Sequence, residues 1–347
     1  MDSKVLRGKK MKTRVAINGF GRIGRNAFKI AFERPDLDIV AINDLTATDV
    51  LAHLLKYDTS YGTYQRPVSS MEKKILVDGR EIPVTAEKDP ANLPWKELGV
   101  DVVIESTGRF TKAEDARLHI RAGAKKVVIS APSKGDGVDT LVIGANEEKI
   151  DDSGDVISNA SCTTNSVAAV MSIMDNEFGV QKAMLTTVHS YTASQVLQDA
   201  PAKDLREARA AAENIVPTTT GAAIAVTQTL PQLKGKFDGL SVRVPTPVVS
   251  LSDITLLLKK SATIDQINEL FKTTIKEPYY QGILDVSETP LVSKDYVGNS
   301  HSGIVDLLLT NVVDGDLAKV VVWYDNEWGY SNRLVELVAD VGKTIKS

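Results

Sequence analysis

The only cysteine of the 347-residue chain, Cys162, lies in the hexapeptide Ala160-Ser161-Cys162-Thr163-Thr164-Asn165. This hexapeptide follows an apolar, strand-like pair, Val156 and Ile157, and precedes a segment predicted as helix over 166–174. A cysteine on the last turn before a helix lies beside free backbone N–H groups and the positive end of the helix dipole. Both favour the nucleophilic thiolate. A lone cysteine is more often a small buried hydrophobe, so position alone leaves both interpretations open.

The second feature with a chemical role is a glycine-rich turn, Gly19-Phe20-Gly21-Arg22-Ile23-Gly24. A short buried strand over 14–18 precedes it, and a helix ended by Pro35 and a second strand over 37–42 follow it. Glycines at this spacing let the backbone approach a pyrophosphate, which binds at the helix N-terminus. Asp44 follows the second strand, where its carboxylate can bind ribose hydroxyls. Together these elements predict a dinucleotide-binding site.

The remaining elements divide into two patterns. Before the cysteine we predict hairpin strands within 68–87 around Asp78-Gly79, and buried parallel strands over 100–104 and 125–130 with a helix between them. After it, strands are predicted over 182–189, 240–244, 249–259, 304–313 and 318–324, the last two joined around Asp314-Gly315, and then a final helix. The first pattern favours a doubly wound parallel sheet of the Rossmann type. The second favours an α+β domain with a mostly antiparallel sheet.

Composition restricts the class of protein. Hydrophobic residues make up 43% of the chain, which is enough for a core, and the length allows two domains. The net charge is −4, which gives no electrostatic reason to expect nucleic acid or an anionic membrane as the main partner. One cysteine cannot form an internal disulfide, so a reducing, cytoplasmic location is expected. No apolar run reaches membrane-spanning length, and no metal site is predicted. We treat residues 1–11 as an N-terminal extension of the fold.

Several long strings resemble one family, the phosphorylating glyceraldehyde-3-phosphate dehydrogenases. They are the turn Gly19–Gly24, Asn43-Asp44-Leu45, Lys56-Tyr57-Asp58, Ala160–Asn165, Thr187–Thr192, Pro217–Gly221, Arg243–Pro247 and Trp323–Asn332. The resemblance implies an NAD-binding Rossmann domain over 12–161, completed by a C-terminal helix over 329–347, and a catalytic domain over 162–328. It also implies a homotetramer in which the long segment 190–217, which shows little strand pattern, lies at a subunit interface.

The resemblance also implies a role for each site residue. Cys162 would attack the aldehyde of glyceraldehyde 3-phosphate, and His189 would stabilise the thiolate as an ion pair and act as the base. Inorganic phosphate would then release an acyl phosphate, 1,3-bisphosphoglycerate, in glycolysis or gluconeogenesis. Contacts to NAD would come from Gly19, Gly21, Arg22, Ile23, Gly24, Asp44, Lys88, Ser130 and Asn326. Substrate and attacking phosphate would bind Ser161, Thr163, Thr192, Thr220, Gly221 and Arg243, since arginine forks and hydroxyls suit phosphate.

The chain departs from the family pattern at two positions. Ser166 stands where many relatives carry a second cysteine, and Glu207 stands where some bacterial relatives carry a phosphate-binding arginine. Either Arg206 or Arg209 could replace that arginine, and the sequence leaves the choice open. Two other functions also remain open: the same chemistry on erythrose 4-phosphate, and a non-catalytic NAD-binding redox sensor. The presence of Cys162, His189 and Arg243 together argues against the second.

Overall fold

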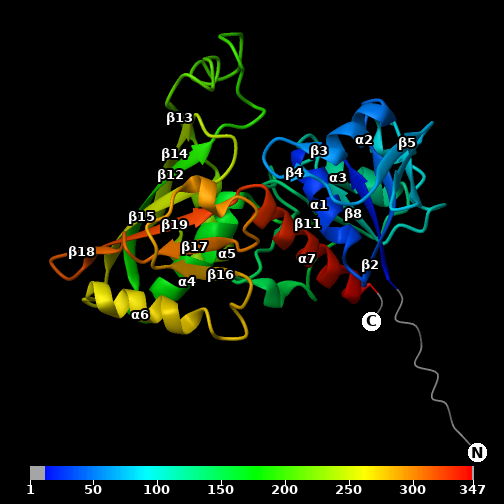
Figure 1. Ribbon diagram of the computed structural model, residues 1–347. Coiled ribbons are helices and arrows are strands. Elements are labelled where there is room, and N and C mark those ends of the chain that lie inside the picture. Colours follow the sequence, from blue (N-terminus) through cyan, green and yellow to red (C-terminus); the bar gives the residue numbers. More distant parts are fainter. Residues whose placement is uncertain (1–11, 346–347) are drawn as a thin grey trace, which may run out of the picture.

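The computed structural model describes residues 12–345, so the predicted N-terminal extension lies outside the described residues. Two sheets organise the chain, one of nine strands and one of eight, and a pair of short strands, β3 (Tyr57–Asp58) and β4 (Gly62–Thr63), lies apart from them. Figure 1 shows the two sheets as separate parts with the last helix, α7 (Trp328–Thr344), lying between them. Within the described part of the chain, no helix has the length and apolar character needed to cross a membrane.

The nine-stranded sheet is parallel over seven strands and antiparallel at one edge. In sheet order its strands are β10 (Asp139–Thr140), β11 (Val156–Ser158), β9 (Lys126–Ile129), β8 (Val102–Glu105), β1 (Thr13–Asn18), β2 (Leu37–Asn43), β7 (Arg80–Thr85), β6 (Lys74–Val77) and β5 (Val68–Met71). Strand β1 pairs with β2 on one side and with β8 on the other. The chain therefore changes direction across the sheet at β1, which is where open α/β sheets bind ligands.

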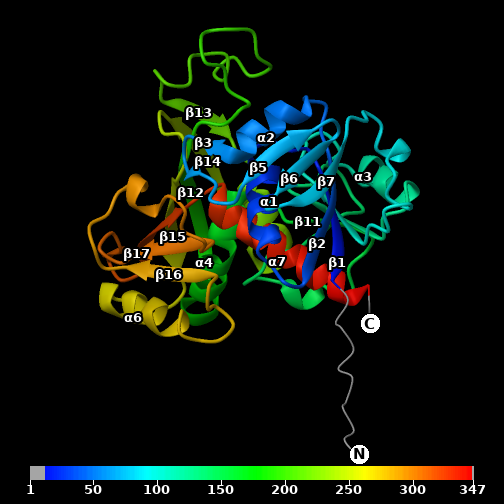
Figure 2. The ribbon, with the colours of Figure 1, turned by 45° about the vertical axis from the view of Figure 1, so that its right-hand side comes forward.

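Helices cover both faces of this sheet because its strands are apolar on both sides. Val15 and Ile17 of β1 belong to the cluster that includes α1 (Arg22–Phe32) and α7, whereas Ala16 points to the opposite cluster with α3 (Ala113–Arg121). Helix α2 (Thr48–Lys56) packs on the edge hairpin. Figure 2 shows α1 and α7 crossing the same face of the sheet. This arrangement confirms the predicted Rossmann architecture.

The second sheet is mainly antiparallel, with two parallel pairings. Its strands run β13 (Val216–Thr219), β14 (Phe237–Val244), β12 (Val180–Ser190), β15 (Ser250–Leu258), β19 (Leu317–Tyr324), β17 (Gly303–Asp306) and β16 (Leu284–Ser287), and β18 (Asn311–Val313) pairs with β19. The parallel pairs are β12 with β14 and β16 with β17. The helices that accompany this sheet are α4 (Cys162–Phe178), α5 (Ala222–Thr229) and α6 (Ile264–Thr274). Short 3-10 turns complete the chain at Pro90–Asn92, Glu147–Lys149, Pro231–Leu233 and Ser293–Tyr296.

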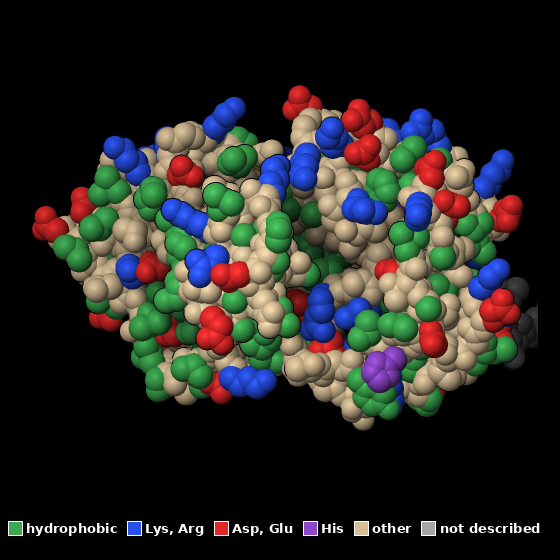
Figure 3. Space-filling model, turned by 90° about the horizontal axis from the view of Figure 1, so that it is seen from above, with side chains coloured by type: hydrophobic (Ala, Val, Ile, Leu, Met, Phe, Trp, Pro, Cys, Tyr) green, Lys and Arg blue, Asp and Glu red, His purple; other side chains and the backbone are tan. Residues whose placement is uncertain are grey.

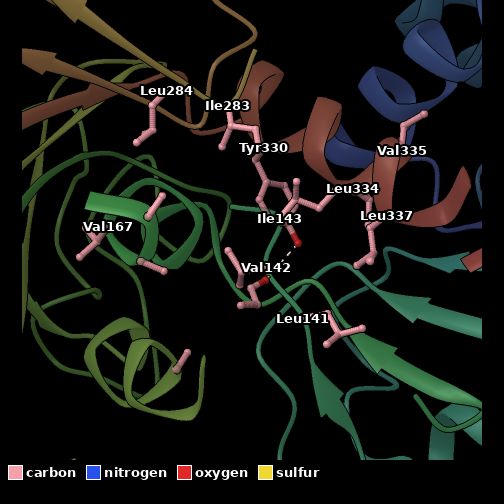
Figure 4. Packing of buried hydrophobic residues seen from close by; sticks show 14 of the residues in the cluster. Leu141, Val142, Ile143, Val167, Ile283, Leu284, Tyr330, Leu334, Val335 and Leu337 are labelled. Atoms are coloured by element: carbon pink, nitrogen blue, oxygen red, sulfur yellow. Dashed lines mark hydrogen bonds between the residues drawn. The ribbon is translucent and has the colours of Figure 1, made fainter. Parts of the chain in front are cut away.

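Alternation along β12 decides which side chains reach the interior. Leu185, Thr187 and His189 are buried on the face that α4 and α5 cover, whereas Met184, next to Leu185, is 60% exposed on the other face. One continuous core then links the two sheets through α4 and α7. Figure 4 shows Tyr330, Leu334 and Leu337 of α7 packed towards the segment Leu141–Ile143, with Val167 of α4 nearby.

Three sequence-based predictions need correction. The predicted strand 304–313 is two strands, because Asp306 accepts a hydrogen bond from the N–H of Leu308 and turns the chain between β17 and β18. The helix that follows the cysteine hexapeptide begins at Cys162 rather than at 166, since Ser161 caps it. Helices α2, α5 and α6 were not predicted. The segment 191–215 contains neither helix nor strand, in agreement with its predicted lack of strand pattern.

Candidate active site

Cys162 is the first residue of α4 and follows a strained turn. Its strand, β11, ends at Ser158, and Ala160 then adopts a φ of 53°, a left-handed conformation that costs a non-glycine residue about 1–2 kcal/mol. The Tyr330 hydroxyl holds the turn by donating to the Ala160 carbonyl at 3.0 Å. The Ser161 hydroxyl caps the helix by accepting from the N–H of Thr164 at 3.1 Å. The turn leaves the Cys162 side chain partly accessible at the positive end of the helix.

His189 meets this cysteine from the other sheet. Its Nε2 lies 3.5 Å from the Sγ of Cys162, although 27 residues separate the two in the sequence. The imidazole is 5% exposed and lies edge-on to the ring of Tyr324, with ring centroids 6.1 Å apart. The structure thus brings the two predicted catalytic residues into contact, with the ring held by neighbouring side chains.

Arg243 lies directly opposite His189 in the register of the parallel strands β12 and β14. Its Nη1 is 2.6 Å from Nδ1 of His189 and 3.4 Å from the carbonyl oxygen of Ser190. The same Nδ1 lies 2.7 Å from that carbonyl oxygen. The Nε of Arg243 is buried and has no hydrogen-bond partner among the described residues. A buried, unpaired guanidinium donor is costly and marks a place where an anion would be stabilised.

Burial and the Arg243 charge set the protonation of the pair. Burial raises the pKa of the Cys162 thiol, while the Arg243 charge and the backbone N–H of Thr163 lower it in part. Burial, together with the Arg243 charge, lowers the pKa of His189 to about 3. Burial therefore opposes the ion pair expected from the sequence. The neighbouring cation that favours a thiolate is Arg243.

Several residues of the predicted phosphate site lie at or near the starts of α4 and α5. The Thr163 hydroxyl lies 2.8 Å from that of Tyr324, and the Thr220 hydroxyl accepts from the N–H of Ala222 at 3.1 Å. Gly221 is the N-cap of α5, and a side chain placed there would meet nothing within 4 Å, so space remains beside its backbone. Thr192 lies on the wall of a cavity of about 370 Å³ that Arg22 also lines.

Arg209 is not brought to this group. Its Nε donates to the carboxylate of Asp199 at 2.8 Å, and the side chains are 60% and 59% exposed. Among the residues that the structure describes, no hydrogen bond or ion pair joins Arg209 to Cys162, Thr220 or Arg243. The arrangement gives no support to Arg209 as the replacement for the phosphate-binding arginine.

The glycine turn between β1 and α1 is shaped for close backbone approach. A Cβ at Gly24 would lie 2.1 Å from the carbonyl oxygen of Gly19, and a Cβ at Gly19 would lie 2.7 Å from the amide nitrogen of Thr107. Gly19 also has a φ of 92°, which favours glycine. Gly21 faces open space, with nothing within 4 Å of a Cβ built there. The turn therefore packs tightly on the protein side and is open on the side where a pyrophosphate would bind.

A pocket of about 280 Å³ adjoins this turn. Its walls include four of the predicted cofactor residues, Gly19, Gly21, Asp44 and Lys88. The Asp44 carboxylate accepts hydrogen bonds from the N–H groups of Phe20 at 2.7 Å and Thr46 at 2.9 Å, which fixes its orientation. Sequence reasoning missed two other wall residues, Arg109 and Phe110. Their position shortly after β8, at the carboxyl edge of the sheet, was the signal that could have identified them.

Five predicted cofactor residues lie outside that pocket, and one of them is Gly24 of the glycine turn. Ile23 packs its side chain on the core, and Ser130 follows β9 and donates its N–H to the Glu105 carbonyl. Asn326 is buried after β19 and accepts from the Ser250 hydroxyl at 3.0 Å. The guanidinium of Arg22 is paired with two carboxylates, those of Asp58 and Glu327.

Figure 3 shows a hollow between the two parts of the molecule, with Lys and Arg side chains on its rim. The comparisons with known proteins fit this arrangement. The family model for the glyceraldehyde 3-phosphate dehydrogenase NAD binding domain matches residues 13–113, and the model for the C-terminal domain matches 161–326.

Curated relatives match nearly the whole chain. Glyceraldehyde-3-phosphate dehydrogenase of Geobacillus stearothermophilus is 54% identical over 330 residues, covering 95% of this chain and 98% of the relative. Glyceraldehyde-3-phosphate dehydrogenase 1 of Bacillus subtilis is 52% identical, with 96% and 99% covered. That of Streptomyces coelicolor is 52% identical, with 96% and 100% covered. The chain belongs to the glyceraldehyde-3-phosphate dehydrogenase family.

Proposed function

We propose that this NAD-dependent enzyme oxidises glyceraldehyde 3-phosphate with inorganic phosphate to 1,3-bisphosphoglycerate, using Cys162 as nucleophile and His189 as base. The observation that carries the proposal is the 3.5 Å contact between Cys162 Sγ and His189 Nε2 at the start of α4. A thiol at a helix N-terminus, beside an imidazole and a guanidinium, is suited to covalent catalysis on a carbonyl carbon. The reaction belongs to glycolysis or, in reverse, to gluconeogenesis.

The chain's own groups account for the covalent steps. The Cys162 sulfur attacks the aldehyde carbon as the thiol proton passes to Nε2 of His189, and the oxyanion that forms can accept from the N–H groups at the start of α4. Return of that proton to the oxyanion gives the hemithioacetal. His189 takes the hydroxyl proton of the hemithioacetal at Nε2 as it is oxidised to a thioester on Cys162. Inorganic phosphate then attacks the thioester carbon, which breaks the carbon–sulfur bond and releases the acyl phosphate and the thiolate.

The residues present fit NAD. The tightly packed turn with its open side at Gly21, together with the fixed carboxylate of Asp44, provides a pyrophosphate cradle and a ribose acceptor. Gly19, Gly24 and Lys88 would complete the adenosine half, and Asn326 would hold the nicotinamide end by resemblance to the family. When bound, NAD supplies the hydride acceptor for the oxidation.

Arg243 is proposed as the main phosphate ligand. Its buried, unpartnered Nε and its place between β12 and β13 favour this role. Ser161, Thr163, Thr192, Thr220 and Gly221 would supply further donors. Arg209 is a weaker candidate because Asp199 already pairs with it at the surface.

We also propose a homotetramer in the cytoplasm. Large apolar side chains are exposed on the open face of the second sheet and on the long segment beside it, which favours burial against other subunits. They are Met184 at 60%, Leu240 at 44%, Leu197 at 82%, Leu205 at 83% and Ile215 at 71%. We divide the chain into an NAD-binding domain, 12–161 with the C-terminal helix 329–347, and a catalytic domain, 162–328. The contact of α7 with α1 supports this division.

Turnover assays test the proposal. Purified protein is assayed for NADH formation with glyceraldehyde 3-phosphate and with erythrose 4-phosphate, each with and without inorganic phosphate. The expected result is phosphate-dependent turnover with a higher kcat/KM for glyceraldehyde 3-phosphate, and its loss in Cys162→Ser. A higher kcat/KM for erythrose 4-phosphate would assign the alternative substrate. NAD binding without any turnover would instead indicate a non-catalytic sensor.

A further inference from the structure

A buried carboxylate behind the cofactor pocket takes no part in the proposed reaction. Glu105 is the last residue of β8 and is 1% exposed. Its Oε2 accepts from the side-chain amide of Asn18 at 2.6 Å and lies 3.1 Å from Nε2 of His119. Its Oε1 accepts from both the backbone N–H and the hydroxyl of Thr107. Asn18 and Thr107 are wall residues of the pocket, so one carboxylate holds two parts of the wall.

Trp95 determines which nitrogen of His119 carries the proton. The indole Nε1 of Trp95 lies 2.9 Å from Nδ1 of His119 and can only donate a hydrogen bond. Nδ1 therefore accepts, and the ring proton is on Nε2, from which it is donated to Glu105. A proton on Nδ1, with or without one on Nε2, would set two donors against each other. The Glu105 carboxylate then accepts from four donors, which stabilises a buried negative charge.

The carboxylate also sets the orientation of two side-chain amides. Because it can only accept, Asn18 presents its NH₂ group to Glu105 and its oxygen to Asn43, whose Nδ2 donates to that oxygen at 2.7 Å. The Asn43 amide in turn binds both backbone groups of Glu87, accepting from the N–H and donating to the carbonyl at 2.9 Å each. Reversal of the Asn43 amide would oppose like groups at both atoms of Glu87. Glu87 and Lys88 line the pocket.

His119 holds a further part of the same wall. Its ring meets that of Phe110, another wall residue, edge to face, with the centroids 6.3 Å apart and the planes at 84°. Trp95, which donates to His119, lies at the end of the segment 87–95. Asn43 binds the other end of that segment at Glu87. One buried network therefore anchors both ends of the segment that carries the predicted cofactor residue Lys88.

We propose that Glu105 and His119 are positioning residues for NAD, which fix the donor and acceptor pattern of the pocket wall and so set the affinity for the adenosine half of the cofactor. The inference rests on the proposed binding of NAD in this pocket. The catalytic pair Cys162 and His189 shares no hydrogen bond of this network. Disturbance of the network should therefore raise Kd and KM for NAD and leave kcat at saturating NAD nearly unchanged.

The substitution Glu105→Gln tests this with little change of side-chain size. It replaces one acceptor oxygen by an NH₂ group at a position surrounded by donors, which leaves buried groups unpaired. We expect Kd for NAD, measured by titration calorimetry, to rise about tenfold or more. Turnover at saturating NAD should stay within about twofold of the wild type. A Kd like that of the wild type would overturn the inference.

Asp306→Asn makes the same chemical change at a matched position in the second sheet. Asp306 is 3% exposed, and its carboxylate accepts from the indole N–H of Trp323 at 3.0 Å. This variant controls for a general loss of stability, which urea unfolding measures in both proteins. Its Kd for NAD should equal that of the wild type. An equal rise of Kd in Glu105→Gln and Asp306→Asn would mean that the Glu105 network is only structural.

Two His119 variants decide the question if Glu105→Gln does not fold. His119→Leu removes the donor to Glu105 and should weaken NAD binding, whereas His119→Gln places an amide NH₂ group near the position of Nε2 and should recover part of the affinity. Equal Kd values for these two variants would refute the role of His119. ¹⁵N NMR of labelled histidines, with the His119 signals identified by His119→Gln, should show a proton on Nε2 and none on Nδ1. A proton on Nδ1 would contradict the proposed network.

The wild-type measurements separate this inference from the proposed function. Wild-type protein is assayed for NAD binding and for turnover of glyceraldehyde 3-phosphate in the same buffer as the variants. Normal wild-type binding and turnover together with unaltered Kd values in the variants overturn only the inference on Glu105 and His119. Absent NAD binding or absent turnover in the wild type overturns the proposed function itself.

Discussion

Arg22 and Glu327, which are 305 residues apart in the sequence, form a two-point ion pair, with Nε 3.0 Å from Oε1 and Nη2 2.5 Å from Oε2. Arg22 begins α1 directly after the glycine turn, and Glu327 precedes α7 directly after Asn326. The ion pair therefore connects the glycine turn, which is proposed to bind the pyrophosphate of NAD, with the segment at Asn326, which is proposed to bind its nicotinamide end. Asp58, whose side chain is 1% exposed, binds the same guanidinium.

We expect Glu327→Gln to weaken both the fold and cofactor binding. The Glu327 side chain is 15% exposed and that of Arg22 is 35% exposed, so the loss should fall between surface and buried pairs, roughly 1–3 kcal/mol. Urea unfolding measures the stability, and titration with NAD measures affinity. Asp340→Asn removes the exposed pair with Lys343 and serves as the control, with an expected change within about 0.5 kcal/mol. Equal effects of the two substitutions would contradict the prediction.

Replacing His189 with Asn should slow turnover by about 10²–10⁴-fold, the usual contribution of a general base. Asn keeps a polar group near the Ser190 carbonyl but cannot take a proton at the position of Nε2. Steady-state kcat with glyceraldehyde 3-phosphate, NAD and phosphate provides the measurement. NAD affinity should stay near that of the wild type, which controls for misfolding. A loss of less than about tenfold would mean that another group acts as the base.

Alkylation of the single thiol tests which cation favours the thiolate. Burial raises the pKa of Cys162, and Arg243 is the neighbouring charge that lowers it. The rate of alkylation by iodoacetamide should therefore rise with pH, and its midpoint reports the pKa of the thiol. This pKa should be higher in Arg243→Leu than in the wild type, since the cation that favours the thiolate is lost. His189→Asn should move the pKa of the thiol less, because burial lowers the pKa of His189 to about 3 and so works against a positive charge on the ring. A larger pKa shift in His189→Asn than in Arg243→Leu would instead support the ion pair expected from the sequence.

Sequence patterns predicted the parts of the site that depend on local order. The order of a buried strand, the glycine turn Gly19–Gly24, a helix, a second strand and an acidic residue was enough to predict the cofactor turn and the role of Asp44. The Cys162–His189 pair came from the family resemblance, because the first residue of α4 and a residue near the end of β12 share no local pattern. The register that places Arg243 opposite His189 was not predictable either. It depends on a parallel pairing of β12 and β14 within a sheet expected to be mostly antiparallel.

Helix α5 and the ion pairs of Arg22 escaped prediction for related reasons. Ala222–Thr229 is short, and its five apolar residues stand together before three polar ones, so it has no amphipathic period to detect. The partners of Arg22 at Asp58 and Glu327 lie far away in the sequence. The assignment of Arg22 as a cofactor contact rested on resemblance. The structure shows that two carboxylates already bind its guanidinium and would compete with a cofactor for it.

Replacing Arg243 with Leu should damage the reaction of the phosphorylated aldehyde more than that of its unphosphorylated analogue. Loss of a charge-assisted fork to phosphate costs about 1.5–3 kcal/mol, or roughly 10–150-fold in kcat/KM for glyceraldehyde 3-phosphate. Unphosphorylated glyceraldehyde lacks the group that Arg243 would bind, so its kcat/KM should fall less. Arg243→Lys should recover part of the difference. Equal losses for both aldehydes would mean that Arg243 acts only on His189 or on the fold.

The enzyme should prefer NAD to NADP because of Asp44. Its two carboxylate oxygens each accept one backbone N–H, from Phe20 and Thr46, and each retains a lone pair for a ribose hydroxyl. A 2′-phosphate would remove one donor and bring negative charge against this fixed carboxylate. The exposed Lys88 and Arg109 on the same pocket wall offset part of that repulsion. The measurement is kcat/KM for both coenzymes at saturating aldehyde and phosphate.

Substitutions in the same pocket test whether Asp44 causes the preference for NAD over NADP. Asp44→Ala should lose efficiency with NAD and narrow the ratio between the coenzymes, since it removes both the ribose acceptor and the repulsive charge. That substitution also leaves the Phe20 N–H without its acceptor, so the ratio is more informative than either value alone. Asp44→Asn keeps one acceptor oxygen and controls for this loss. Arg109→Ala should widen the ratio in favour of NAD by removing a cation that a 2′-phosphate could use. An unchanged ratio in Asp44→Ala, or equal efficiency of the two coenzymes in the wild type, would show that coenzyme choice is made elsewhere in the site.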